Sequence, residues 1–347
     1  MDISNYIDAL PTHHDENYLY TDAHEALIDV DTIVNASIDA SGIGGSIVGT
    51  VQQMNPSSAF NSDIAQELVN LNTAAVEDIL NVEFNEENPQ PVTINLSSEG
   101  GKSVLAQSRI DINATERASG QLVINTNGIK SSANCVLKIN IAPSAALDIV
   151  FLQTENNEAP VFINSDIDIQ HDARITVSTV NITPGYVRNN LQVNFRGEHA
   201  EAKLYGIYKA NAGHVDNTTL VKHLVPNCTS EELYKGVLDG NAVGAFSGRV
   251  VVAQDAQKTS SQQTNRNMLL STDAHAYAKP QLEIYADDVK CSHGATSGQI
   301  DQQQLFYMQQ RGIDAKTAKE LLTDAFLLEV ANNIPVEAVR NVLIAAE

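Results

Sequence analysis

The 347-residue sequence contains no tryptophan, and aromatic residues make up only 5% of the chain. Because carbohydrate-binding grooves usually rely on aromatic platforms, this shortage argues against a sugar-binding protein. Basic residues are also scarce, since 21 lysines and arginines face 43 acidic residues, for a formal net charge of -22. A chain of this charge repels phosphate backbones and anionic lipid. We therefore expect neither nucleic acid nor a membrane among its partners.

Long apolar runs are absent from the sequence, and cysteines are few. No stretch has enough consecutive apolar residues to span a bilayer, and residues 1–20 are acidic and polar where a secretory signal is basic and then apolar. The three cysteines, Cys135, Cys228 and Cys291, are too widely spaced and odd in number for a disulfide framework. These features predict a cytoplasmic protein.

Short runs of alternating apolar and polar residues fill the chain from about residue 91 to about residue 252, for example VTINL, QLVINT, CVLKINI and ALDIVFL. Such alternation predicts β-strands. The runs are separated by turn residues and not by helices, which argues against a doubly wound parallel sheet. A sandwich, a barrel and a β-solenoid remain open. The asparagines that recur beside apolar residues favour the stacked coils of a β-helix.

Helical patterns flank this region. Residues 63–80 place apolar side chains on one helical face and predict a helix. After residue 252 we expect the strands to give way to helices, at residues 301–311 with Asp301 as the cap, from Asp314 onward, and from about Pro335 onward. This tail has more apolar surface than it can bury alone, so it either docks on the body of the protein or binds a partner.

The segment KCSHGATSG, residues 290–298, contains the sharpest candidate for chemistry. Residues two apart in an extended segment project from the same face, so Cys291 and His293 can reach one metal ion or cluster. Zinc sites need three or four protein ligands, and no CxxC or HExxH motif supplies the others. The pair is therefore part of a site shared with another chain, or it is a buried cysteine beside a turn histidine. As a nucleophile and its base, the pair lacks an orienting group.

Three stretches, at residues 215–240, 246–271 and 279–313, are similar to the core of a known family. That family is SufB/SufD, the scaffold subunits of the SUF machinery for iron-sulfur cluster assembly. The third stretch contains KCSHGAT, and a segment with both Cys and His resembles the SufD branch. The motif ENYLYTDAHEAL at residues 16–27 resembles the one that precedes the family's β-helix.

The resemblance implies a mainly β fold, with a right-handed parallel β-helix core and a small C-terminal helical domain. We expect an N-terminal segment at residues 1–85, shorter than the helical region of other members, the β-helix core at 86–298 and the helical domain at 299–347. The implied function is that of a non-catalytic scaffold subunit. It would pair with a SufB-type subunit through the β-helix and bind a SufC-type ATPase through the helical tail.

The resemblance also assigns roles to individual residues. His293, with Cys291 as a second candidate, is expected to hold a transient iron-sulfur cluster at the subunit interface, shared with the partner. Four residues between this site and the tail are candidates for coupling it to the ATPase partner: Phe306, Tyr307, Arg311 and Gly312. Packing in the core explains the two aromatic residues equally well.

Two alternatives belong to other classes. The first is a β-helix enzyme that acts on acidic polysaccharide, with carboxylates of residues 163–172 in a groove, although the negative charge of the chain would repel an anionic substrate. The second is a plain structural β-helix, which predicts a stable homodimer that needs no other partner.

Overall fold

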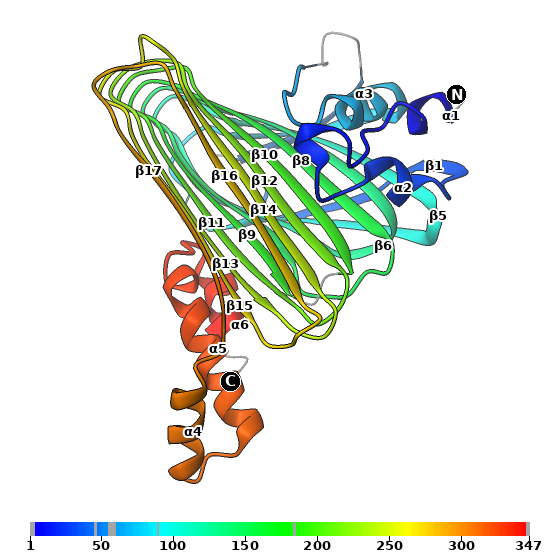
Figure 1. The fold of residues 1–347 in the computed structure, drawn as a ribbon. Helices are drawn as coiled ribbons and strands as arrows, with labels where there is room; N and C mark the ends of the chain where they lie inside the picture. Colours follow the sequence, from blue (N-terminus) through cyan, green and yellow to red (C-terminus); the bar gives the residue numbers. More distant parts are fainter. Residues whose placement is uncertain (1–3, 45–46, 55–59, 89, 183–184, 345–347) are drawn as a thin grey trace.

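The structure is a computed structural model that describes residues 4–44, 47–54, 60–88, 90–182 and 185–344. The chain is mainly β, with 54% strand and 16% helix, and forms a parallel β-solenoid of about eight turns followed by helices (Figure 1). The predicted mainly β fold, with a parallel β-helix and C-terminal helices, is confirmed.

Successive strands of the solenoid alternate between two stacks. We call them the even stack and the odd stack. The even stack continues from the second half of β6 (Ser119–Ile141) through β8 (Pro160–Ile169), β10 (Tyr186–Phe195), β12 (His214–His223), β14 (Val243–Val252) and β16 (His275–Ile284). The odd stack continues from the first half of β6 through β7 (Ala146–Gln153), β9 (Arg174–Ile182), β11 (Glu201–Ala210), β13 (Thr229–Leu238), β15 (Ser260–Leu269) and β17 (Lys290–Gln299).

The first coils are less regular. They comprise β1 (Thr32–Asn35), β2 (Ser37–Ser41), β3 (Ile47–Gln53), β4 (Asp78–Phe84) and β5 (Val92–Ala114). β2 runs antiparallel to β5 and β3 antiparallel to β4, whereas β4 and β5 are parallel, as are β5 and β6.

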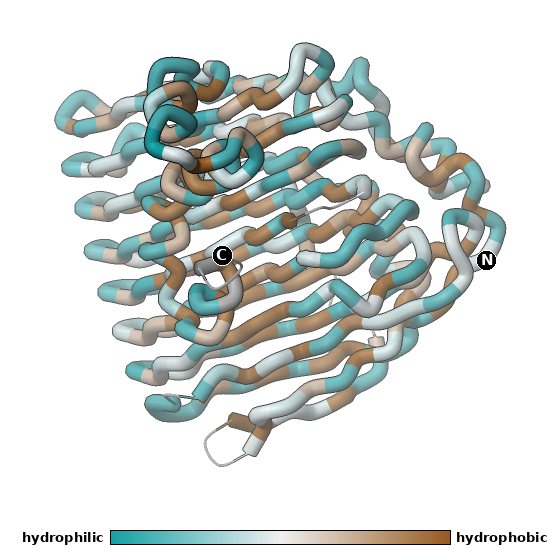
Figure 2. Tube along the Cα trace, turned by 90° about the horizontal axis from the view of Figure 1, so that it is seen from below, coloured by the Kyte–Doolittle hydropathy of each residue, from teal (hydrophilic) through white to brown (hydrophobic). Residues whose placement is uncertain are grey.

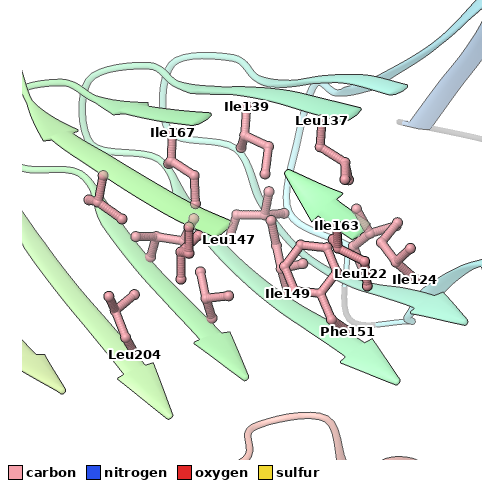
Figure 3. Packing of buried hydrophobic residues seen from close by; sticks show 14 of the residues in the cluster. Leu122, Ile124, Leu137, Ile139, Leu147, Ile149, Phe151, Ile163, Ile167 and Leu204 are labelled. Carbon is pink, nitrogen blue, oxygen red and sulfur yellow. The ribbon is translucent and has the colours of Figure 1, made fainter. Parts of the chain in front are cut away.

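The interior of the early coils is apolar. Side chains alternate across each strand, so every second residue points between the two stacks. Leu137 and Ile139 of β6 lie there with Leu147, Ile149 and Phe151 of β7 (Figure 3). Along the tube in Figure 2, hydrophobic residues follow the strands and hydrophilic ones gather at the turns. Burial of this apolar surface is the main source of stability for the stacked coils.

One corner of the coil repeats in conformation but not in sequence. Six non-glycine residues with φ between 55° and 64° recur at intervals of one coil: Arg117, Ser144, Asp172, His199, Asn227 and Lys258. Each adopts the left-handed conformation, which most side chains disfavour. The corner repeats in backbone conformation and not in residue type, so the sequence shows no strict repeat.

The N-terminal helices cover the outer face of the even stack (Figure 1). They are α1 (Ser4–Ile7), the 3-10 helix η1 (Glu16–Tyr18), α2 (Ala23–Leu27) and α3 (Gln66–Ala75). The predicted helix over residues 63–80 is wrong in its last part, because α3 ends at Ala75 and Val76 is extended. Ile79 and Leu80 belong to β4, where pairing with β3 and β5 overrides the helical spacing.

The prediction that strands give way to helices after residue 252 is also wrong. Three further strands, β15, β16 and β17, extend the solenoid to Gln299. The sequence pattern is weak here because the interior positions of β15 are polar. Ser261, Gln263, Asn265 and Asn267 are all buried, so the usual alternation of apolar and polar residues is missing.

The C-terminal helices are α4 (Gln302–Gln310), α5 (Ala315–Ala331) and α6 (Glu337–Ile344). The predicted cap at Asp301 and the predicted helix start at Asp314 are confirmed, since both side chains accept hydrogen bonds from backbone N–H groups in the first turns of α4 and α5. Leu327, Val330 and Val339 pack on Tyr205 and Leu233 of the odd stack. α5 and α6 therefore dock on the body. Among the described residues, no helix is long and apolar enough to cross a membrane.

Candidate functional site

Cys291 and His293 lie on β17, the last strand of the solenoid. β17 pairs in parallel with β15, with Cys291 opposite Ser261 and His293 opposite Gln263. Cys291 is partly buried against the interior cluster, and His293, two residues along, points to the same side of the strand. His293 is exposed because, in the part of the chain that the structure describes, no further coil is stacked on β17. The structure thus brings both candidates to the open end of the interior.

The thiol of Cys291 is not activated within this chain. Burial raises its pKa above the ordinary value, and the backbone N–H of Ser261 opposes this shift to a smaller extent. A neutral thiol is a poor ligand and a poor nucleophile. Cys291 therefore needs a bound cation, or a positive group from another molecule, before it can act as a thiolate.

The described part of the chain does not complete a metal site around this pair, since it holds no group of three His, Cys, Asp or Glu residues suited to a metal ion. The other two cysteines belong to other coils: Cys135 lies on β6, and Cys228 lies just before β13 and donates from Sγ to the carbonyl oxygen of Gly197. Further ligands would therefore have to come from another chain or from the cluster itself.

Two columns of interior residues lead to the pair along the odd stack, from β7 to β17. The column that ends at Cys291 contains Leu147, Ile175, Ala202, Ser230, Ser261 and Cys291. The column that ends at His293 contains Ile149, Val177, Leu204, Glu232, Gln263 and His293. Both columns change from apolar to polar at β13. The floor of the candidate site is therefore polar.

Hydrogen bonds join the polar residues of these columns to one another and to β12. Thr219 Oγ1 donates to Glu232 Oε2 at 2.6 Å, and Gln263 Nε2 donates to Glu232 Oε1 at 3.0 Å. Ser230 Oγ lies 2.9 Å from His223 Nε2 and 2.8 Å from the hydroxyl oxygen of its register partner in β15. The floor is thus an ordered network inside the solenoid.

Burial shifts the pKa values of the two ionisable groups of this network in opposite directions. It raises the pKa of Glu232 to about 7, against the smaller opposing effect of the hydrogen bonds from Thr219 and Gln263. It lowers the pKa of His223 to about 3. Both shifts favour the uncharged form, as expected for groups removed from water. His223 is neutral and Glu232 is poised to titrate near neutral pH.

Sequence reasoning missed Glu232 and Gln263. Glu231 and Glu232 are adjacent, and the strand pattern does not say which of them points inward. The structure places Glu231 on the outer face and Glu232 in the interior. The signal that could have identified Glu232 as an interior residue is its register with Leu204, an apolar interior residue one coil earlier.

The coupling candidates lie on and after α4, which follows β17 directly. Phe306 and Tyr307 are 59% and 56% exposed, and α4 has no buried residue. The alternative that these aromatics pack in the core is therefore wrong. The guanidinium of Arg311 lies 5.1 Å from the ring centroid of Tyr307, and Gly312, with φ of 90°, ends the helix. α4 thus presents two exposed aromatic side chains directly after the last strand of the solenoid.

A comparison with protein-family models matches residues 95–326 to the SufBD core domain of the SUF system for FeS cluster assembly. The chain is 32% identical over 223 residues to the iron-sulfur cluster assembly protein SufD of Escherichia coli strain K12, a match that covers 64% of this chain and 53% of that protein. It is 30% identical over 254 residues to the iron-sulfur cluster assembly SufBD family protein slr0076 of Synechocystis, covering 72% and 54% of the two chains. The chain thus spans about half the length of these relatives.

Proposed function

The chain belongs to the SufBD family of the SUF system for iron-sulfur cluster assembly, and from this premise we propose that it is a non-catalytic, cytoplasmic scaffold subunit. A nascent cluster would form at its terminal coil, between this chain and a SufB-type subunit. The observation that carries the proposal is the position of Cys291 and His293. They point into the interior from the last strand, where a second chain can add the missing ligands.

The chemistry of the two side chains supports this role. Thiolate sulfur and imidazole nitrogen both ligate iron in iron-sulfur proteins. Each must lose its proton to bind, so cluster retention should rise with pH. The cluster is transient cargo here, and the partial exposure of the site suits its transfer to another protein.

The helical tail supports a second partner. α4 exposes Phe306 and Tyr307, and aromatic side chains are enriched at the centres of protein interfaces. We propose that a SufC-type ATPase binds there. Only Ile300 and Asp301 separate β17 from α4, so a movement of α4 driven by the ATPase can reach His293. Arg311 and Gly312 would set the position of α4 relative to α5.

The test is co-expression under anaerobic conditions with SufB-like and SufC-like partners from the same source. Iron and acid-labile sulfide are measured in the purified complex for the wild type, for His293→Ala and for Cys291→Ser. His199→Ala, at an exposed corner of the solenoid, is the matched control. We expect His293→Ala to lose cluster while the complex still assembles. Unchanged cluster content in His293→Ala would remove His293 from the site.

The two alternative functions are less well supported. Of the carboxylates in residues 163–172, Asp166 accepts from Lys138 Nζ at 2.5 Å, and Asp168 accepts from Lys138 at 2.9 Å and from Arg196 at 3.1 Å. Asp166 and Asp168 are thus engaged in ion pairs, and the third acid, the half-exposed Asp172, lies 3.0 Å from His171 Nε2. A homodimer through the terminal coil would appear as a doubled mass of the chain purified alone.

A further inference from the structure

The interior of the last coils contains a feature that packing alone does not require. Leu204 of β11 occupies the interior position that Glu232 occupies in β13 and Gln263 in β15. Burying a carboxyl group costs free energy that a leucine would not cost. Gly248 of β14 leaves room for this arrangement, because a Cβ atom there would lie 2.2 Å from Gln263 Nε2.

The amide of Gln263 is oriented by Glu232. Gln263 Nε2 donates to Glu232 Oε1, so Gln263 Oε1 is turned away from this carboxyl group. Gln263 is fully buried, and among the described residues its Oε1 has no hydrogen-bond partner. A buried carbonyl oxygen without a partner destabilises the folded state, because it has lost its hydrogen bonds to water. The arrangement therefore points to a nearby side chain that can donate to this oxygen.

The next residue along the column is His293. Register partners in parallel strands point the same way and lie about 4.8 Å apart. In this solenoid, such partners do form side-chain hydrogen bonds: Ser230 with Ser261 at 2.8 Å and Asn189 with Asn217 at 3.0 Å. A bond from a ring N–H of His293 to Gln263 Oε1 would continue this pattern by one coil, since the two residues are register partners.

We propose that Glu232 is a positioning residue for His293: it holds Gln263 so that the carbonyl oxygen of Gln263 accepts one imidazole N–H and fixes the ring's tautomer. The consequence for the metal rests on the function proposed above. A ring whose one nitrogen donates to a carbonyl oxygen presents the lone pair of the other nitrogen, and such a bond also raises the basicity of the ligand.

The experiment is NMR of the metal-free full-length chain, labelled with nitrogen-15 at histidine, at about pH 8, where an ordinary imidazole is neutral. The signals of His293 are assigned by their absence in His293→Ala. We expect a single tautomer in the wild type. Glu232→Leu and Gln263→Leu should both lose this preference and show the tautomer mixture of an exposed histidine.

Two further variants serve as controls. Glu232→Gln keeps an oxygen that accepts from Gln263 Nε2, so it should restore the single tautomer. Glu231→Gln, on the outer face of the same strand, should change nothing. Glu232→Leu continues an apolar column and should fold, and the unchanged signals of the other histidines will verify this.

A tautomer mixture at His293 in the wild type would overturn the inference, as would a single tautomer that survives Glu232→Leu. The outcome is separate from that of the cluster experiment. If the tautomer depends on Glu232 but His293→Ala keeps its cluster, the positioning role stands and the proposed function fails.

Discussion

Lys235 of β13 and Glu329 of α5 form an ion pair across the junction between the solenoid and the helical tail, with 2.6 Å between Nζ and Oε2. Nζ also donates to the carbonyl oxygen of Phe326 at 2.7 Å. The bond from Lys235 lowers the pKa of Glu329, with help from the nearby Arg266. Since Lys235 is buried, this contact fixes α5 on the outer face of the odd stack together with the apolar residues around it.

Lys235→Met should loosen α5, because a hydrogen bond that involves a charged group contributes about 1.5–3 kcal/mol. We expect a lower free energy of urea unfolding and faster hydrogen exchange in residues 315–331. Lys203→Met is the control, since that lysine pairs with Glu201 at the surface and such pairs contribute about 0–1 kcal/mol. Equal exchange in the two variants would show that apolar packing alone holds α5.

Phe306→Ala and Tyr307→Ala should weaken binding of the SufC-type partner without destabilising the fold. Both side chains are exposed, so each change should alter the unfolding free energy by less than about 0.5 kcal/mol. Leu327→Ala, at a buried position of α5, should cost about 2–5 kcal/mol. In a binding assay with the SufC-type partner, the two α4 variants should lose affinity. Full affinity in both would place the ATPase contact elsewhere.

Arg188→Met should release the N-terminal segment. Arg188 Nη1 lies 2.5 Å from Asp216 Oδ2, and both side chains are buried. Its guanidinium lies 3.9 Å from the ring centroid of Tyr18, and Thr21 donates to Asp216. Removing one partner of a buried pair costs about 3–5 kcal/mol because the other charge is left unpaired.

The measurement for Arg188→Met is limited proteolysis of residues 4–30 together with urea unfolding. The double variant Arg188→Met with Asp216→Leu leaves no unpaired charge, so it should recover part of the lost stability. If the double variant is no more stable than the single one, the ion pair does not account for the loss.

Glu232 should make stability fall as pH rises. Its pKa is about 7 in the folded protein and about 4.3 in an unfolded chain, so the folded state binds more protons between these values. Stability from this group is fully present below about pH 4.3 and is lost as pH rises through 7, by on the order of 3 kcal/mol. In urea unfolding from pH 5 to pH 8, wild type should lose stability relative to Glu232→Gln. Parallel pH profiles would contradict the shift.

His223 should have the opposite effect on the pH dependence of stability. Its pKa is about 3 when folded and about 6.5 when unfolded, so the unfolded state binds more protons between these values. Stability is lost as pH falls from about 6.5 toward 3. His223→Gln has no group that titrates here, and its amide keeps a polar partner for Ser230. Its unfolding temperature should therefore fall less between pH 7.5 and pH 4 than that of the wild type. Thermal unfolding at the two pH values measures this.

Much of the fold was predictable because strand alternation and helix caps are local. Asp301 and Asp314 begin helices as their positions predicted, and the runs between residues 91 and 252 form strands. The predictions failed where non-local contacts decided the outcome. Ile79 and Leu80 pair in a sheet despite helical spacing, and β15 continues the solenoid with Gln263 and Asn265 inside. The division at residues 85 and 298 stays a prediction.

The amino-acid sequence alone was enough to establish that Cys291 and His293 share one face and that the chain has no complete ligand motif, because spacing and ligand number can be counted. It also established a succession of short β-strands, because alternation reports burial on one side of a strand, while the coiled architecture was implied by the family resemblance. The three-dimensional structure was needed to show that Glu232 points inward and Glu231 outward, that the aromatics of α4 are exposed, and that the pair lies on the last coil. Burial is set by neighbours from other coils, about 30 residues away in sequence, and a local pattern does not identify those neighbours.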